Sequence, residues 1–333
     1  MKNNSNASDI IYGVACAESL SFPASYYRVA SLAPKRTARM QALEKFRTEH
    51  FQTNLPTPYT HAQPPHLLNP EPSVMTEWFA FSLLGFLAPT TAREYWAPLI
   101  EQESTIRTRG GTKIALQNLA QGIIPPHSGH DNPHYFDDLA MVRSIGAALV
   151  PNVSKSDLIA LVASDSEITH SEDGIWCAQA TASLLWDIMN GFEVKEAISR
   201  ALDYLPSDSW SRQRADEALR VVKNSDSMLT RIMALENEFT DRIYAYGIAA
   251  PDTFGLLIAH LSSSTSASEL IGCSYMHRRN LEALPALMGA FTGALHGDSW
   301  LPSGYVGSDL RLKGVSIPSL AGTLISDLVA LVN

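Results

Sequence analysis

Residues 73–87, SVMTEWFAFSLLGFL, indicate the architecture of this chain because they are apolar on almost every face of a helix. A helix that is hydrophobic all round is buried in a protein core or spans a membrane. This run is shorter than the roughly 18 residues that a membrane-spanning helix needs. Ser73 follows Pro72 and is a residue type that favours the N-cap position. We therefore expect a central buried helix that begins after Ser73.

The segments around this helix also have helical spacing, and almost none alternates with the period of two that a strand requires. The expected helices cover residues 10–20, 34–50, 109–122, 139–149, 156–164, 166–191, 194–205, 211–222, 229–240, 253–260, 269–275, 284–296 and 319–331, with loops at 21–27 and 51–72. We predict an all-α fold, a single compact multi-helix domain over residues 10–333 that follows a disordered tail at residues 1–9.

One expected helix, residues 284–296, has an unusually bare face. Gly289, Gly293 and Gly297 recur every four residues and so lie on one side of it. Each internal glycine costs about 1 kcal/mol relative to alanine in a helix. The spacing therefore predicts very close contact with a second helix.

Composition excludes several classes of protein. With 333 residues, 45% hydrophobic content and a net charge of −9, the chain can form a large core but lacks the excess of Lys and Arg that nucleic acid or anionic membranes require. Cys16, Cys177 and Cys273 form no CxxC pair, and the polar start lacks the layout of a signal peptide. We expect a cytoplasmic protein that binds neither nucleic acid nor membrane.

The densest polar stretch is residues 127–141, HSGHDNPHYFDDLAM. Pro125 and Pro126 before it and Gly129 and Pro133 within it indicate an ordered loop, and helical spacing begins after Asp138. Asp137 and Asp138 therefore lie at a helix N-terminus, where the helix dipole favours negative charge. One interpretation is a capped helix start after a surface turn. The other is a loop-to-helix junction that lines a ligand-binding cleft.

Four separated segments resemble the ADP-ribosylglycohydrolases of the dinitrogenase-reductase-activating type. Residues 12–27, YGVACAESLSFPASYY, resemble the family's opening helix and loop, and residues 73–77, SVMTE, fall at its Thr-Asp-Asp-Thr-Glu metal motif. Residues 168–170 resemble its ITH motif, and residues 280–305 resemble its DxDT segment with the GALAGAxYG and IPxxW motifs that follow. The resemblance implies the all-α fold of that family and a hydrolase acting on ribosyl bonds.

The same resemblance implies two Mg²⁺ ions, but most of their ligands are replaced. Val74 and Met75 stand at two ligand aspartates and have no oxygen to coordinate Mg²⁺. In the second motif Asn280 and Glu282 match the two aspartates, and Ala283 matches the threonine. We predict that the Mg²⁺ pair is lost, with no metal site and no other cofactor.

The remaining polar residues give a candidate site. A metal-free glycosidase needs one carboxylic acid and one carboxylate around the scissile bond, which Asp137 or Asp138 could form with Glu77 or Glu282. The candidate ligand-binding residues are Glu18 (at the family's GDALG aspartate), Ser73, His130, Asn132, His170, Arg278 and Asn280. Each has an ordinary alternative: an arginine partner for Glu77, helix capping for the two aspartates, and a structural hydrogen bond for His170.

Residues 277–279, His-Arg-Arg, form a basic cluster where the family has glycines that face the metals. They are either a solvated turn or cations that fill the vacated metal site, where they would neutralise Glu282 or bind phosphate.

Two functions follow from these features. The first is a divergent ADP-ribosylglycohydrolase-like enzyme that cleaves a ribosyl N- or O-glycosidic bond without metal. The second is an inactive relative that binds ADP-ribose, a nucleotide or a partner protein. The lost ligands favour the second, and the polar loop favours retained chemistry; the sequence leans slightly towards the enzyme. The expected partner is a small-molecule or ADP-ribosylated ligand, and the oligomeric state is not determined.

Overall fold

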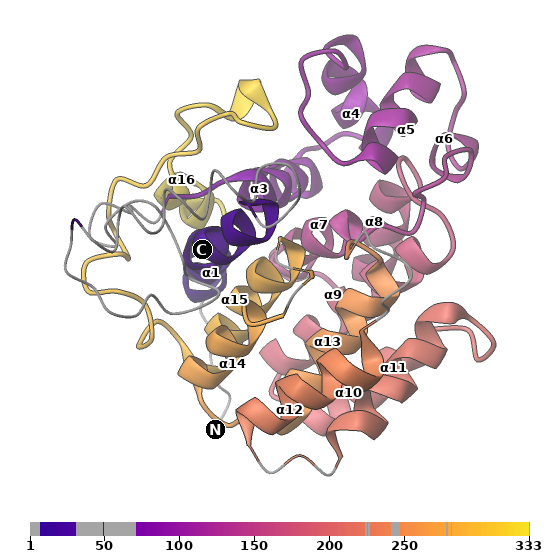
Figure 1. Cartoon of the computed structure of the whole chain (residues 1–333). Helices are drawn as coiled ribbons and strands as arrows, with labels where there is room; N and C mark the ends of the chain where they lie inside the picture. The colour runs from indigo at the N-terminus through magenta and orange to yellow at the C-terminus, as the bar shows by residue number, and fades with distance from the viewer. Residues whose placement is uncertain are drawn as a thin grey trace.

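The structure is a computed structural model that describes residues 7–30, 49, 71–223, 225, 227–240, 247–277, 279–280 and 282–332, with only the backbone at 22–30. Its helices, labelled in Figure 1, are α1 (Ala7–Ala30), α3 (Val74–Leu87), α4 (Ala92–Glu101), α5 (Gly110–Ala120), α6 (His127–His130), α7 (Leu139–Ala148), α8 (Lys155–Ser166), α9 (Asp173–Met189), α10 (Val194–Leu202), α11 (Trp210–Val222), α12 (Met228–Ala234), the π-helix η2 (Leu235–Phe239), α13 (Ala250–Ser263), α14 (Ala267–Ser274), α15 (Ala283–His296), the 3₁₀-helix η3 (Pro318–Leu320) and α16 (Ile325–Ala330).

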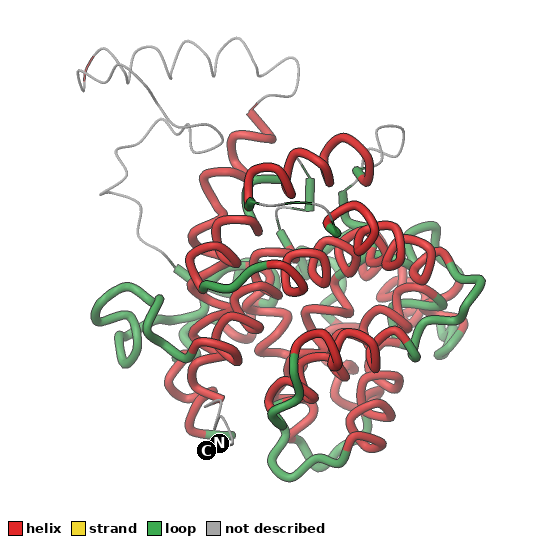
Figure 2. The backbone as a smooth tube through the Cα atoms, turned by 90° about the horizontal axis from the view of Figure 1, so that it is seen from below, coloured by secondary structure: helices red, strands yellow, loops and turns green. Residues whose placement is uncertain are grey.

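The described residues contain no β-strand, as the tube drawing in Figure 2 also shows. Their extended pairing is limited to two isolated bridges, Asp137 with Ala249 and Arg311 with Leu324. The predicted all-α fold is confirmed. None of the described helices is long and apolar enough to cross a bilayer.

The helices pack around one continuous apolar cluster. Helix α3 packs on α7, α7 on α9, and α1 on α15, so the expected central helix lies within the core (Figure 1). Trp78 and Phe79 of α3 have no exposed surface. The cluster also contains Cys16 and Cys177, which are free thiols, as is buried Cys273. The apolar character of residues 73–87 on almost every helix face was thus sufficient to identify which helix is buried.

The glycine-lined face of α15 makes the predicted close contact with α1. A methyl group built on Gly289 would lie 2.1 Å from the carbonyl oxygen of Gly13, and one built on Gly293 would lie 2.3 Å from that of Asp9. The two backbones therefore touch at positions where no side chain fits. Gly297, the third glycine of the pattern, is the C-cap of α15 at φ 67°.

Gly289→Ala should therefore destabilise the protein although alanine favours helix. Overpacking typically costs 1–3 kcal/mol, and the obstruction here is backbone that cannot rotate away, so we expect a net loss of about 2 kcal/mol in urea unfolding. Gly272→Ala is the matched control, because its methyl group would meet only the Met228 sulfur, at 3.6 Å. That substitution should stabilise the protein by about 0.5–1 kcal/mol. Equal effects of the two substitutions would contradict the close contact.

Some expected boundaries were wrong. Residues 21–27, expected as a loop, continue α1, and the expected helix at 319–331 is split into η3 and α16. Helix α4 was missed, although Thr91 and Glu94 form a capping box at its start, which is a sequence-level signal. The helix expected at 34–50 and the loop expected at 51–72 lie almost wholly outside the described residues.

Candidate functional site

The polar loop at 127–138 is fixed from within and by its neighbour at 166–170. Asn132 is 6% exposed; its amide donates to the Gly129 carbonyl at 2.6 Å and accepts from the His134 N–H at 2.9 Å. The Ser128 hydroxyl donates to the Ile168 carbonyl at 2.9 Å. Asn132, proposed as a ligand-binding residue, therefore shapes the loop.

His130 lies on the outer side of this loop. Its imidazole is 58% exposed, 3.0 Å from the Asp131 carboxylate, and stacked on Tyr135 with the ring centroids 6.2 Å apart. It is accessible to a ligand but separate from the carboxylates described next.

Asp137 and Asp138 lie at the start of α7, and neither carboxylate is exposed. Asp137 Oδ1 accepts from the Leu139 N–H at 2.9 Å, so Asp137 satisfies one of the free amides of the helix. Asp138 occupies the N-cap position, but its side chain makes no capping bond. The capping interpretation of this junction is thus met by Asp137, whereas the side chain of Asp138 is directed elsewhere.

The partner of these aspartates is Arg109, which sequence reasoning missed. Its guanidinium forms an ion pair with Asp138 through Nη1, and the same nitrogen lies 3.9 Å from Asp137 Oδ1. Nη2 donates to Glu282 Oε2 at 3.3 Å. One cation therefore joins three of the four carboxylates predicted to be catalytic. Its side chain is only 9% exposed.

Glycine brings Arg109 to this position. Arg109 is the N-cap residue of α5, and Gly110 and Gly111 follow it. A methyl group on Gly111 would lie 2.7 Å from the His134 carbonyl oxygen and 2.8 Å from Asp137 Oδ2. The start of α5 can therefore press against the polar loop only because residue 111 has no side chain. The Arg-Gly-Gly sequence was the available signal for this contact.

A second set of bonds ties Asp138 to α13 and the 277–282 segment. The Thr253 hydroxyl donates to Asp138 Oδ2 at 2.6 Å, and the Asn280 amide donates to the Thr253 hydroxyl at 2.8 Å. Asn280 adopts φ 59°, in the left-handed region, and its N–H donates to the Gly247 carbonyl at 3.2 Å. Asn280 and Asp138 are thus brought together through Thr253, which sequence reasoning did not select.

His170 is held in one tautomer on the other side of Asp137. The carboxylate only accepts, so His170 Nε2–H donates to Asp137 Oδ1 at 3.0 Å. The neutral ring then accepts at Nδ1 from the Thr169 hydroxyl at 2.7 Å, while Thr169 accepts from Arg143 Nη2 at 2.9 Å. Burial lowers the pKa of His170 and outweighs the opposing effect of Asp137, which keeps the ring neutral. The predicted structural hydrogen bond of His170 is present.

These partners determine the protonation of Asp137. Burial alone would raise the pKa of this carboxyl, but His170, Arg109 and the Leu139 N–H together outweigh burial and lower it. Asp137 is therefore ionised at neutral pH. Its other oxygen, Oδ2, accepts no hydrogen bond from the described residues.

Glu18 and Glu77 both accept hydrogen bonds from backbone N–H groups, but in different places. Glu18 is 8% exposed, and its carboxylate accepts from the N–H groups that begin α3; burial raises its pKa, although these bonds lower it. Its donors are the backbone N–H of Ser73 (3.1 Å), Met75 (2.8 Å) and Thr76 (3.0 Å) and the Thr76 hydroxyl (2.6 Å). Glu18 therefore caps α3 from a separate helix, whereas Ser73 occupies the N-cap position without a side-chain capping bond.

Glu77 is unexposed and accepts from three consecutive backbone amides. The Val315 N–H donates at 2.8 Å, the Ser316 N–H at 2.7 Å and the Ile317 N–H at 3.1 Å. The arginine partner expected for Glu77 is replaced by backbone N–H groups, because a loop crosses the start of α3. The structure does not place Glu77 with the three carboxylates that surround Arg109.

Comparison with known proteins identifies the family of this chain. The ADP-ribosylglycohydrolase family profile matches residues 2–329. The chain belongs to the ADP-ribosylglycohydrolase family. A solved structure described as an ADP-ribosylglycohydrolase-related protein complex superposes with a TM-score of 0.52 at 18% identity, covering 80% of this chain and 82% of that one. At that identity the likeness shows the fold alone. No curated protein sequence matches the chain.

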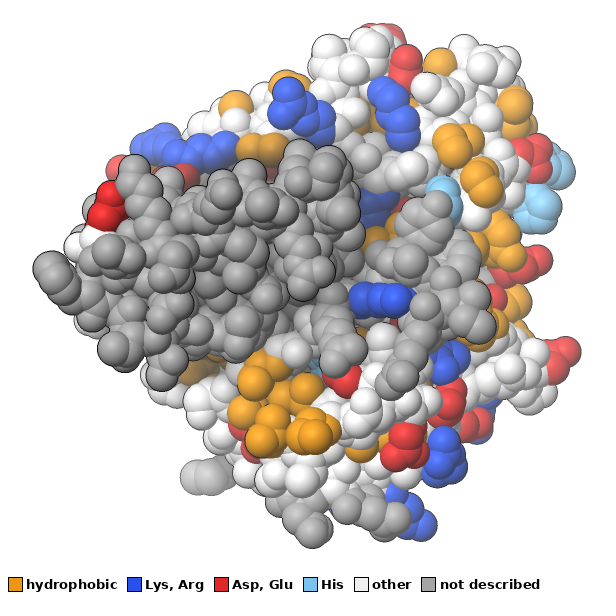
Figure 3. All heavy atoms as spheres, viewed as in Figure 1, with side chains coloured by type: hydrophobic (Ala, Val, Ile, Leu, Met, Phe, Trp, Pro, Cys, Tyr) orange, Lys and Arg blue, Asp and Glu red, His pale blue; other side chains and the backbone are white. Residues whose placement is uncertain are grey.

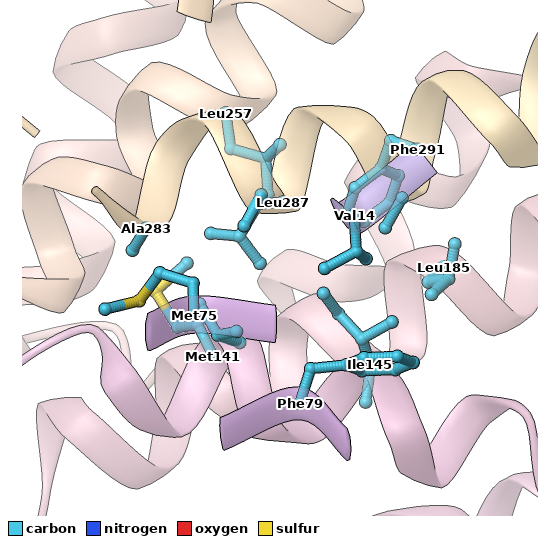
Figure 4. Packing of buried hydrophobic residues seen from close by; sticks show 14 of the residues in the cluster. Val14, Met75, Phe79, Met141, Ile145, Leu185, Leu257, Ala283, Leu287 and Phe291 are labelled. Carbon is cyan, nitrogen blue, oxygen red and sulfur yellow. The ribbon is translucent and has the colours of Figure 1, made fainter. Parts of the chain in front are cut away.

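Val74 and Met75, which the resemblance aligns with two metal-ligand aspartates, lie in or against the apolar core of this chain. Met75 is 2% exposed and belongs to the apolar cluster, and Val74 packs against that cluster. Figure 4 shows Met75 of α3 and Met141 of α7 together, with Ala283 and Leu287 of α15 facing them. Apolar contacts therefore occupy the position where the family pattern has acidic side chains.

Of the basic cluster at 277–279, the structure shows His277 paired with residues other than the site carboxylates. His277 is 2% exposed, and its ring lies against Glu236 and His260 instead. Arg278 lies outside the described residues, and Arg279 is half-buried. Within the described ranges, no three His, Cys, Asp or Glu side chains are arranged to hold a metal ion.

Proposed function

We propose that this chain is a non-catalytic ADP-ribosylglycohydrolase relative that binds an ADP-ribose-type ligand without metal. The observation that carries the proposal is the ion pairing of Arg109 with Asp138 and Glu282, beside Asp137. A guanidinium provides, as a fixed part of the protein, positive charge that a metal ion would otherwise bring. This favours the second of the two functions that the sequence allowed.

The residues present do not fit the family's Mg²⁺ pair. Mg²⁺ requires hard oxygen ligands in near-octahedral geometry. Val74 and Met75 offer no such atom, and the carboxylates of Asp138 and Glu282 already face Arg109. A dication would have to displace the guanidinium that is paired with both of these carboxylates.

Neither Asp137 nor Glu18 is suited to donate the proton that glycoside hydrolysis needs. Such hydrolysis pairs an ionised carboxylate with a carboxylic acid whose pKa is raised. The pKa of Asp137 is shifted in the opposite direction. Glu18 does have a raised pKa, but both of its oxygens are bound at the start of α3. Neither carboxyl can donate a proton to a leaving group.

Ligand binding has support of its own. Glu282 is 45% exposed and presents a carboxylate at the edge of the cluster, where it can accept from sugar hydroxyls. Asp137 Oδ2 is buried without a donor among the described residues. Buried acceptors normally have partners, so a ligand hydroxyl or a bound water would complete this one.

A direct test compares turnover with binding. We expect no release of ADP-ribose from ADP-ribosyl-arginine or ADP-ribosyl-serine in Mg²⁺ or in EDTA, whereas calorimetry should detect ADP-ribose binding of equal affinity in both. Glu282→Ala should weaken that binding about tenfold, because hydrogen bonds to charged groups contribute roughly 1.5–3 kcal/mol. Glu196→Ala, on an exposed position of α10, is the control and should bind as wild type does.

Turnover in EDTA would instead support metal-independent hydrolysis, the first of the two hypotheses. Turnover that depends on Mg²⁺ would overturn the proposed role of Arg109. Absence of both turnover and binding would leave the fold assignment intact and contradict the proposed function.

A further inference from the structure

A second buried polar cluster lies between α12, η2, α13 and α14. Nε2 of His260 and Nε2 of His277 are 2.7 Å apart, and His277 Nδ1 is 2.9 Å from Glu236 Oε1. Arg231 Nε donates to His260 Nδ1 at 3.3 Å. His260, His277 and Arg231 are at most 2% exposed. The proposed binding site does not use this cluster.

The chemistry of the donors gives the chain of hydrogen bonds one direction. Arg231 can only donate, so His260 Nδ1 accepts and His260 carries its proton on Nε2. That proton is donated to His277 Nε2, and His277 then donates from Nδ1 to Glu236. Both rings are neutral in this arrangement. A further proton on either ring would set one N–H group against another and break a bond of the chain.

Helix α12 has a charged side chain buried and apolar side chains exposed, which is the reverse of the usual hydrophobic pattern. Arg231 is 2% exposed, whereas Leu229 and Met233 are 57% and 54% exposed. In Figure 3 apolar side chains gather on the surface over α12 and α14. The buried bonds of Arg231 hold the helix in this orientation. Besides His260 its acceptors are Glu269 Oε1 (2.6 Å), the Ser264 hydroxyl (2.8 Å), the Ser263 carbonyl (3.4 Å) and Cys273 Sγ (3.6 Å).

The histidine pair also connects to the binding site through α13. His277 holds its segment to α13 at His260, and Asn280 holds the same segment to α13 at Thr253. Residues 253 and 260 are two helical turns apart, so they lie on one face of α13. Release of the first contact therefore loosens the segment that bears Asn280 and leads into Glu282.

Burial and neighbouring charges oppose protonation of His260. Burial lowers the pKa of His260 well below its usual value, and His277 and Arg231 lower it further. Glu236 of η2 faces His277, and Glu269 and Cys273 of α14 face Arg231. The charged groups of α11 lie at the far end of η2. Arg214 there contacts the Phe239 carbonyl, Glu217 and Asp252.

We propose that His260 and His277 form a pH-operated latch, whose protonation releases α12 and the segment at 275–280 and so loosens the ligand-binding site. The two states differ in packing as well as charge. When the chain of hydrogen bonds breaks, α12 loses the bond to His260 that helps to keep Arg231 inside and Leu229 outside. A bistable element biased by buried histidine is a recognised basis for pH switching.

The direction of the pH response follows from the linkage between proton binding and folding stability. A histidine whose pKa is lowered in the folded state stabilises that state fully above its unfolded pKa of about 6.5 and progressively less as pH falls below it. For one proton taken up on opening, the open fraction rises about tenfold between about pH 7.5 and about pH 5.5.

Hydrogen exchange of the full chain tests the latch. After correction for intrinsic rates, we expect exchange in α12 and at residues 275–280 to rise about tenfold between those two pH values, with α9 unchanged as the internal reference. Nitrogen NMR at the higher pH should show His260 protonated on Nε2 and His277 on Nδ1. Unchanged exchange, or the opposite tautomers, would overturn the proposal.

A double variant separates the effect of histidine protonation from the effect of the hydrogen bonds themselves. The double substitution His260→Gln and His277→Gln can keep the directed chain, because each amide both accepts and donates, but it cannot titrate. Its exchange should not depend on pH, whereas His296→Gln, at the end of α15, should respond as wild type does. An equal rise in the double variant would also overturn the latch. Because exchange needs no ligand, a failure of ADP-ribose to bind at neutral pH would contradict only the proposed function.

Discussion

Arg109→Ala is expected to lower the free energy of unfolding by about 3–5 kcal/mol, the usual result when one partner of a buried ion pair is removed. The substitution leaves Asp137 and Asp138 without exposure to water and without the cation beside them. Urea unfolding measures the loss. Arg109→Lys should recover only part of it, because an ammonium group cannot hold two carboxylates with a planar fork.

The same substitution should also create a cation site. The carboxylates of Asp138 and Glu282 are hard oxygen ligands on either side of the vacated guanidinium. Millimolar Mg²⁺ or Ca²⁺ should therefore raise the melting temperature of Arg109→Ala but not of wild type, because only the variant binds the ion in its folded state.

A surface ion pair serves as the control for this experiment. Arg212 and Asp216 are 3.1 Å apart, and their side chains are 32% and 56% exposed, so Arg212→Ala should change stability by less than about 1 kcal/mol and give no response to Mg²⁺. If Arg109→Ala were as stable as wild type, or if Mg²⁺ stabilised both proteins equally, Arg109 would not be the cation of the site.

The fold was predictable because its signals are local. The apolar run at 73–87 contains its own evidence of burial, and the repeat of Gly289 and Gly293 indicates a backbone contact before the partner helix is known. The orientation of helix α12 could not be predicted from local signals, because Arg231 faces inward and Leu229 outward. Only the acceptors around Arg231, from elements later in the chain, explain that orientation.

The site was only half predictable for the same reason. Asp137 and Asp138 stand in a dense polar stretch, so composition alone singled them out. Arg109 lies in an unremarkable Arg-Gly-Gly sequence, and its partners come from two other parts of the chain. Its role depends on Gly111, whose missing side chain lets two segments meet. Proximity of that kind is a property of tertiary structure, and no spacing within the sequence encodes it.

Glu77→Ala should have the second large effect, about 3 kcal/mol or more of lost stability. Three consecutive backbone amides, Val315, Ser316 and Ile317, would lose their acceptor, and each unsatisfied buried donor costs about 1–3 kcal/mol. The loop would also carry the disturbance towards the site, because the Arg107 N–H donates to the Ser316 carbonyl at 3.1 Å, two residues before Arg109. Faster hydrogen exchange at residues 315–317 would report the release.

Glu77→Gln distinguishes this structural role from the catalytic one that the sequence suggested. The amide keeps the shape of the side chain but presents an NH₂ group to N–H donors, so we expect unfolding at lower urea even though the volume is conserved. A catalytic carboxylate would behave in the opposite way, with stability retained and turnover lost. Glu94→Gln is the matched control, since Glu94 also accepts a backbone N–H, from Thr91 at 2.8 Å, but in contact with water. The urea midpoint of Glu94→Gln should equal that of wild type, because water can accept from the Thr91 N–H in place of the lost oxygen. Water cannot do so at the buried N–H groups of residues 315–317.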